Sequence, residues 1–85
     1  MYFVYLLICK DGSIYTGITT DVERRFKEHK SGIGSSYTRS RGVVRIAYAE
    51  LHKDRAQALR REAEIKKWPK SKKIKLIGEP RLTKS

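Results

Sequence analysis

The sequence predicts an α+β fold, with a small three-stranded antiparallel or mixed sheet flanked by two to three helices in the order β-β-α-β-α-α. Two apolar runs joined by a tight turn predict a hairpin, a capped amphipathic segment follows it, and the segment after residue 54 has helical periodicity. The 85 residues, 39% of them hydrophobic, are enough for one folded domain with a small core. We expect a domain over residues 1–78 and a flexible tail over 79–85.

The strands follow from the distribution of apolar residues. Residues 2–9 are largely apolar on both faces, as expected for a strand in the centre of a sheet, and this strand should bury Cys9. Residues 13–18 are its predicted hairpin partner, because Asp-Gly between two such runs is a strong hairpin signal. Residues 42–51 supply the third strand.

The length of the hairpin loop decides whether Tyr5 and Tyr15 share a face of the sheet. A two-residue turn at Asp11-Gly12 would send the two side chains to opposite faces. A three-residue loop, Lys10-Asp11-Gly12, with Gly12 in the left-handed conformation of a bulge, sets Tyr5 opposite Gly17 and puts both tyrosines on one face. We predict the three-residue loop, in which Gly17 leaves room for the Tyr5 ring.

The first predicted helix spans residues 21–30 and turns polar as well as apolar side chains inward. Thr20-Asp21-Val22-Glu23 matches a capping box, and Gly32 can terminate the helix. At about 100° per residue, one narrow arc of this helix collects four side chains, Val22, Arg25, Phe26 and His29. Arg25 and His29 are therefore predicted to face the sheet.

The segment from Ser31 to Arg41 is rich in Gly and Ser and is predicted to be an exposed loop. It is either a mobile connector or a ligand-binding loop, since exposed loops serve both purposes. Arg, Thr and Tyr side chains commonly contact phosphates. As candidate nucleic-acid contacts we consider Tyr37, Thr38, Arg39 and Arg41, together with Lys66 and Lys67 of the following helix.

A second helix is predicted to begin at Asp54 and run to Trp68, where Pro69 interrupts it. Its apolar arc consists of Ala56, Ala58, Leu59, Ala63 and Ile65. Glu62 projects from the middle of this arc, and a carboxylate there is costly unless a cation meets it. The cation could be Lys66, one turn later, or a metal ion. A short third helix is predicted over residues 71–77, closed by Gly78.

The net charge of +11 and the pI near 10.1 indicate a polyanionic partner, most simply nucleic acid. Residues 52–85 carry twelve Lys and Arg against four Asp and Glu, so the basic surface should lie in the C-terminal third. The single cysteine excludes an intramolecular disulfide. The apolar start is too short for a membrane span and lacks a basic leader, so we expect a cytoplasmic protein. The sequence contains no coiled-coil seam that would indicate an obligate protein partner.

The polar residues predicted to point inward fit the hydrolysis of a phosphodiester. They are Tyr5, Tyr15, Arg25, His29 and Glu62. A lone carboxylate can hold a hydrated divalent cation such as Mg²⁺ beside a phosphate. Arginine offers a permanent charge to the phosphate in the transition state, and a phenol close to such cations can act as a general base on water.

These residues and their spacing make the chain similar to the GIY-YIG nuclease domain, particularly to the small stand-alone bacterial members, over roughly residues 1–78. Val4-Tyr5 stands for the first signature element and Tyr15-Thr16-Gly17 for the second, while Arg25, His29 and Glu62 match the helix arginine, the frequent histidine and the metal-binding glutamate. The resemblance implies a three-stranded sheet flanked by helices. It also implies one Mg²⁺ or Mn²⁺ ion on Glu62, with Tyr5 as the base.

The resemblance implies an endonuclease that cuts DNA, in preference to RNA, in structure-directed repair or recombination. The chain contains no asparagine, whereas many family nucleases place one late in the domain, and Ile18 stands where repair-type members have a lysine. These departures support an alternative, a non-catalytic nucleic-acid-binding module with the same fold. A structural or ribosome-associated basic protein would explain the charge but not a glutamate among apolar helix positions.

Overall fold

The computed structural model describes the backbone of residues 1–82 and the side chains of residues 1–78. The predicted α+β class is confirmed, with a three-stranded antiparallel sheet and four helices. In chain order the elements are β1 (Tyr2–Cys9), β2 (Ile14–Thr19), α1 (Val22–Lys30), α2 (Ser36–Arg41), β3 (Val43–His52), α3 (Arg55–Lys66) and α4 (Lys70–Leu82). Among the described residues, no helix has both the length and the apolar character of a membrane span.

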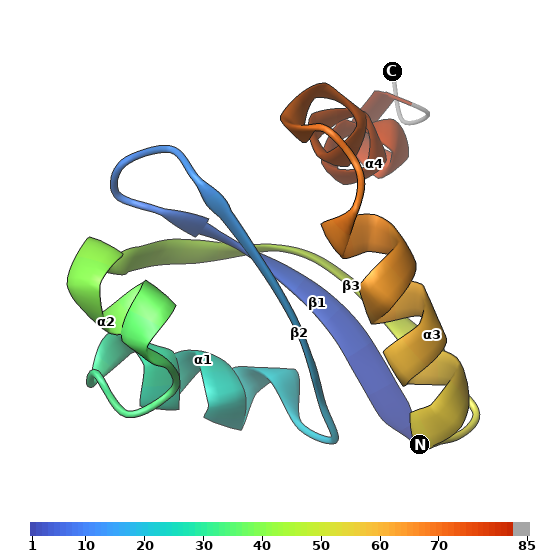
Figure 1. The fold of residues 1–85 in the computed structure, drawn as a ribbon, viewed down its shortest axis with the longest axis horizontal. Coiled ribbons are helices and arrows are strands. Elements are labelled where there is room, and N and C mark those ends of the chain that lie inside the picture. Colours follow the sequence, from blue (N-terminus) through green and yellow to red (C-terminus); the bar gives the residue numbers. More distant parts are fainter. Residues whose placement is uncertain (83–85) are drawn as a thin grey trace.

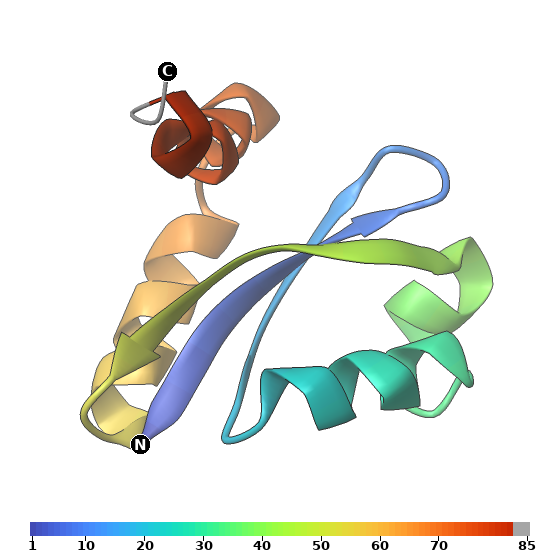
Figure 2. The same ribbon diagram turned by 180° about the vertical axis from the view of Figure 1, so that it is seen from behind.

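The strand order is β2-β1-β3, so the strand with two apolar faces is the central one, as predicted. Helices α1 and α2 cover one face of the sheet and α3 the other, with α4 at one end (Figure 1). Seen from behind, β3 forms the edge opposite β2 (Figure 2). Val4 and Leu6 pack towards α3, whereas Tyr5, Leu7 and the buried Cys9 pack on the opposite face.

The hairpin has the predicted three-residue loop. The Cys9 N–H donates to the Ser13 carbonyl and the Gly12 N–H to the Cys9 carbonyl, both at 2.9 Å. Gly12 adopts φ of +85°, which a glycine tolerates without steric cost. The resulting register sets Tyr5 opposite Gly17 and Leu7 opposite Tyr15, so both tyrosines lie on one face of the sheet.

Two predictions about the first half of the chain are corrected by the structure. The N-cap of α1 is Asp21 rather than Thr20, because the Asp21 carboxylate accepts the N–H of Arg24. The segment 31–41 is not entirely a loop, since its second half forms α2. Ser35 caps this short helix by accepting the N–H of Thr38, which gives the polar segment a helical start.

The C-terminal helices also differ from the predictions in detail. Asp54 caps α3 as expected, with its carboxylate accepting the Gln57 N–H. The buried stripe of α3 is narrower than predicted, because only Ala58 and Ile65 of the apolar arc are buried, while Ala56, Leu59 and Ala63 are exposed. Helix α4 continues through Gly78 to Leu82. The last part of the predicted tail, residues 83–85, lies outside the described residues.

Candidate active site

Tyr5 and Tyr15 form the floor of the candidate site on the face covered by α1 and α2. Their ring centroids are 6.2 Å apart, and Tyr5 is fully buried whereas Tyr15 is half-buried. A β-carbon at position 17 would lie 2.7 Å from the Tyr5 hydroxyl oxygen and 3.0 Å from the Tyr15 ring. Gly17 is therefore the residue that allows the two rings to occupy this face together.

His29 reaches this floor from α1 and links it to α2. Its Nε2 lies 2.9 Å from the Tyr5 hydroxyl, and its Nδ1 lies 2.8 Å from the Thr38 hydroxyl. Thr38 also donates to the Ser35 carbonyl at 3.2 Å, which orients its hydroxyl to accept from His29. This assignment places the ring proton on Nδ1 and leaves Nε2 as the acceptor for Tyr5.

Burial controls the protonation of both partners of this hydrogen bond. Burial and the nearby Arg25 lower the pKa of His29 below its ordinary value, so the ring is neutral near pH 7. Burial, and next the neighbouring Tyr15, raise the pKa of Tyr5, while Arg25 acts in the opposite direction with a smaller effect. The protein's own positive charges therefore do not lower the pKa of this phenol. Ionisation of Tyr5 needs a proton acceptor and further positive charge.

Arg25 is held at the side of the site by two hydrogen bonds. Its Nη1 donates to the Glu28 carboxylate at 2.7 Å, and its Nη2 donates to the Gly34 carbonyl at 3.0 Å. The first of these bonds raises the pKa of Arg25, so the guanidinium is permanently charged. Gly34 is required for the fit, because a β-carbon there would overlap the His29 ring. Arg25 is therefore fixed close to the Tyr5 phenol with part of its surface exposed.

Glu62 approaches the site from α3, which packs on the opposite face of the sheet. Its side chain is 17% exposed and pairs with the Lys66 ammonium at 3.3 Å. The ion pair allowed by the sequence is therefore formed. The pKa of the Tyr5 phenol is raised mainly by burial, and the Glu62 charge adds a small further increase. Lys66 is 54% exposed, so it can move away from the carboxylate into solvent.

The single carboxylate of Glu62 suits a hydrated hard cation. Within the described residues, no group of three or more His, Cys, Asp or Glu side chains could hold a metal. A cation on Glu62 would therefore keep most of its water ligands, as Mg²⁺ commonly does next to a phosphate. Mn²⁺ accepts the same oxygen ligands.

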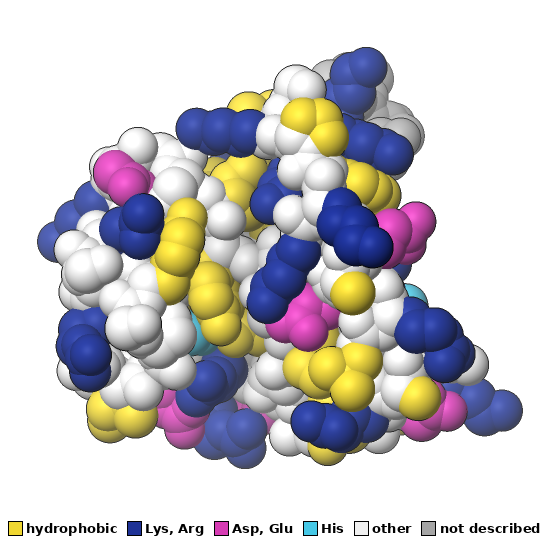
Figure 3. Space-filling model, in the orientation of Figure 1, with side chains coloured by type: hydrophobic (Ala, Val, Ile, Leu, Met, Phe, Trp, Pro, Cys, Tyr) yellow, Lys and Arg dark blue, Asp and Glu magenta, His cyan; other side chains and the backbone are white. Residues whose placement is uncertain are grey.

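A hollow of about 330 Å³ lies beside Tyr15 at the open edge of β2. Ile14, Tyr15, Thr16, Tyr37, Lys66 and Lys73 line it. The buried Thr16 hydroxyl has no hydrogen-bond partner within the described part of the chain. This side of the molecule is indented between the α1–α2 layer and the C-terminal helices, which carry many of the Lys and Arg side chains (Figure 3). The lining of the hollow thus includes both Tyr15 and Lys66, the ion-pair partner of Glu62.

The structure brings some of the predicted nucleic-acid contacts to this hollow and excludes another. The Tyr37 ring lies 5.8 Å from that of Tyr15, and the Arg41 guanidinium stacks on Tyr37 at 3.9 Å. Arg39 and Lys67 are exposed. Thr38 is wrong as a surface contact, because it is fully buried and its hydroxyl is engaged by His29 and Ser35.

Sequence reasoning missed several residues of the site, including Gly34, Ser35 and Lys73. A serine three positions before Thr38 is an N-cap signal, and it could have identified α2 and the position of Thr38. Lys73 gave no such signal, because its place in the hollow depends on how the chain turns between α3 and α4.

Comparisons with known proteins agree with the fold. The family profile described as "GIY-YIG catalytic domain" matches residues 1–75. A UPF0213 protein of Staphylococcus saprophyticus is 44% identical over 78 residues, which cover 92% of this chain and 95% of the relative. The solution structure of the UPF0213 protein from Bacillus halodurans is 47% identical, with a TM-score of 0.58, and the match covers 92% of this chain and 84% of that one. A solution structure from E. faecalis is 38% identical, with a TM-score of 0.62, over 95% and 86% of the two chains.

Proposed function

The chain belongs to the GIY-YIG nuclease family, and on that premise we propose that it is an endonuclease that uses a single Mg²⁺ or Mn²⁺ ion to hydrolyse phosphodiester bonds in DNA. We propose DNA rather than RNA, and substrates of the structure-directed kind that arise in repair or recombination. The observation that carries the proposal is the 2.9 Å hydrogen bond between the Tyr5 hydroxyl and Nε2 of a neutral His29, beside the Arg25 guanidinium, with the Glu62 charge acting weakly on the phenol.

The hydrogen bonds define a route for the proton that must leave the attacking water. In the proposed mechanism Tyr5 accepts that proton as it passes its own hydroxyl proton to Nε2 of His29, to which it is hydrogen-bonded. The imidazolium formed in this way keeps its Nδ1–H bond to Thr38, whose hydroxyl in turn donates to Ser35. The ring cannot rotate away from Tyr5 without losing this bond. His29 therefore serves both as the proton acceptor and as a fixed positive charge after transfer.

Arg25 and Glu62 supply the electrostatic part of the proposed mechanism. The Arg25 guanidinium is oriented by Glu28 and Gly34 before substrate arrives, so it can stabilise negative charge that grows on the phosphate. Glu62 would hold the divalent cation after Lys66 moves aside. When bound, the cation would supply positive charge that favours the phenolate and activates water.

The second candidate function is a nucleic-acid-binding module without turnover. Two observations favour it: Lys66 already neutralises Glu62, and the pKa of Tyr5 is raised rather than lowered. In a nuclease, the divalent cation would displace Lys66 from Glu62 and lower the pKa of Tyr5. The two functions therefore differ in whether added metal produces cutting.

The test compares cleavage of flap, branched and single-stranded DNA, and of matched RNA, with Mg²⁺ or Mn²⁺. Glu62→Ala and Arg25→Ala should abolish cutting, because they remove the metal ligand and the phosphate-stabilising charge. Glu64→Ala is the matched control, since this exposed carboxylate lies two residues away on the same helix. If the wild type binds DNA but never cuts, or if Glu62→Ala cuts equally well, the nuclease proposal fails.

A further inference from the structure

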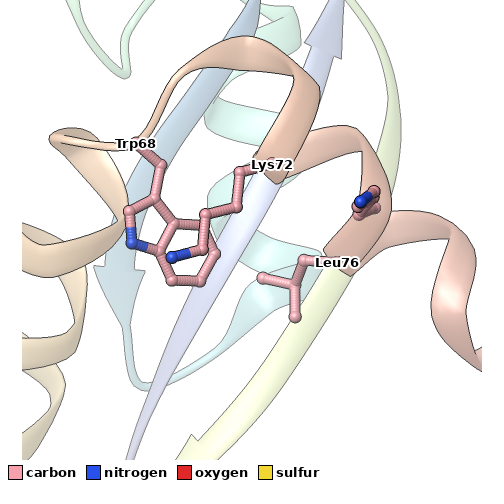
Figure 4. A pocket seen from close by; sticks show the side chains of 4 residues that line it. Trp68, Lys72 and Leu76 are labelled. Carbon is pink, nitrogen blue, oxygen red and sulfur yellow. The ribbon is translucent and has the colours of Figure 1, made fainter.

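A second hollow, of about 210 Å³, lies at the junction of α3 and α4. Trp68, Lys72, Lys75 and Leu76 line it. The Lys72 side chain reaches back across the Trp68 ring, with its ammonium 4.3 Å from the ring centroid. Leu76 lies on the other side of the hollow from the Trp68 ring (Figure 4). Trp68 also packs against the core on the α3 side of the sheet, and this core contact anchors the indole.

We propose that this hollow is an accessory contact for nucleic acid, in which an unpaired base stacks on Trp68 while neighbouring phosphates pair with Lys72 and Lys75. The proposal rests on the proposed function for the class of partner, but it does not require cutting. Base stacking on an aromatic ring combined with flanking cations is the usual chemistry of single-strand contacts. Leu76 provides an apolar wall beside the base.

The charge around Trp68 favours a polyanion over other occupants. Residues 65–78 contain six lysines and no acidic residue. The ammonium that lies over the indole is attracted to the ring only weakly where it remains hydrated, so a phosphate can draw it aside and a base can take its place. A small apolar ligand would fill the hollow without using either lysine, and a basic protein surface would be repelled.

The position of α4 connects this contact with the candidate active site. Lys73 lines the hollow beside Tyr15, whereas Lys72 and Lys75 line the hollow beside Trp68. Helix α4 therefore presents lysines to both hollows from different sides. A strand that leaves the active site across α4 would meet cations along its path and end on an aromatic platform.

Trp68 is the only tryptophan in the chain, so its fluorescence reports directly on this contact. The experiment titrates an oligodeoxythymidylate into the Glu62→Ala variant, in which cutting is prevented, and follows Trp68 emission together with the anisotropy of the labelled strand. An abasic strand of the same length is the control for stacking. We expect the thymidylate to quench Trp68 emission. The abasic strand should bind at least about fivefold more weakly than the thymidylate.

The double variant Lys72→Gln/Lys75→Gln tests the phosphate contacts and leaves Trp68 in place. It should lower the salt dependence of binding, the slope of log K against log salt, by about 1.4 if two single-strand phosphates are lost. The matched control is Lys53→Gln/Arg55→Gln, which removes two exposed charges at the other end of α3. This control should leave the quenching intact.

Binding seen by anisotropy without any change in Trp68 emission would overturn the proposal. An equal decrease of the salt slope in the two double variants, or equal affinity for the abasic strand and the thymidylate, would also overturn it. These outcomes are separate from the nuclease test. A protein that never cuts but still shows base-dependent quenching retains the accessory contact and loses only the catalytic proposal. A protein that cuts with silent Trp68 emission retains the catalytic proposal and loses the accessory contact.

Discussion

Gly17 lies directly opposite Tyr5 in the hairpin, and a β-carbon at position 17 would come within 2.7 Å of the Tyr5 hydroxyl oxygen. Because Tyr5 is fully buried and hydrogen-bonded to His29, its ring has no free space into which it can move. Gly17→Ala should therefore destabilise the fold by about 1–3 kcal/mol, the usual cost of overpacking. It should also reduce cleavage by displacing the phenol.

Urea denaturation and a cleavage assay measure the two effects of Gly17→Ala. Gly78→Ala is the matched control, because a β-carbon at position 78 meets no atom within 4 Å. In a helix interior this change should stabilise by about 0.5–1 kcal/mol. A Gly17→Ala protein with wild-type stability and activity would show that the Tyr5 ring does not need the space left by the missing β-carbon at position 17.

His29 is predicted to be the proton acceptor for Tyr5. His29→Phe keeps a ring of similar size but leaves the buried hydroxyls of Tyr5 and Thr38 without this partner, at a cost of about 1–3 kcal/mol for each unpaired group. Cleavage should fall by about 10²–10⁴-fold, the usual contribution of a general acid or base. The comparison is Thr38→Val, which removes the orienting bond but keeps the imidazole. It should cost less activity and change the pH–rate profile, whereas equal losses would point to a structural role for both residues.

The pH dependence of stability should have two limits set by the Tyr5–His29 pair. The pKa of His29 is lowered by burial, so the unfolded chain binds its proton first, and stability should fall as the pH drops below about 6.5. The pKa of Tyr5 is raised by burial, so the unfolded chain loses its proton first, and stability should fall above about pH 10.

Thermal unfolding of the wild type and of His29→Phe across this pH range tests both limits. Carboxylates with lowered pKa values, such as Glu50 and Asp11, lose their contribution at lower pH, near and below their ordinary pKa values of about 4. The difference between the wild type and His29→Phe in the interval from about pH 5 to 7 therefore reports on His29. An acid limb of unchanged slope in His29→Phe would assign the loss of stability to another group.

Local chemical rules explain why the hairpin could be predicted from the sequence. The position of Gly12 and the apolar pattern of β1 allow few registers, and only one of them puts both tyrosines on one face. The inward direction of Arg25 and His29 followed from helical periodicity, which α1 obeys.

Features that depend on packing between distant segments could not be predicted. The buried stripe of α3 is narrow because the helix meets the sheet along one line, and periodicity alone does not give the width of a contact. The sequence predicts Thr38 in an exposed loop, but its burial depends on His29 from a separate helix. The hollow beside Trp68 requires the turn between α3 and α4, whose direction is not encoded by the Pro69 interruption alone.

A cluster around Glu50 is predicted to hold α3 in the position that brings Glu62 to the site. The Glu50 carboxylate accepts from Arg61 Nε at 2.8 Å and Nη2 at 3.3 Å, from the Tyr48 hydroxyl at 2.7 Å, and pairs with His52 at 2.6 Å. Burial acts to raise the pKa of Glu50, but hydrogen bonds from Arg61, Tyr48 and His52 hold it below its ordinary value. The carboxylate is therefore charged at neutral pH and ties β3 to α3 next to Glu62.

Glu50→Gln should weaken this attachment by about 2 kcal/mol, in the range of hydrogen bonds to charged groups. Because Arg61 directly precedes Glu62, movement of α3 should also shift the Mg²⁺ dependence of cleavage to higher concentrations, with a smaller effect on the rate at saturating metal. Chemical denaturation and a metal titration of activity measure the two effects. Glu64→Gln is the matched control, since it removes the exposed second partner of Arg61. If Glu50→Gln lowers stability but leaves the metal titration unchanged, the cluster stabilises the fold without positioning Glu62.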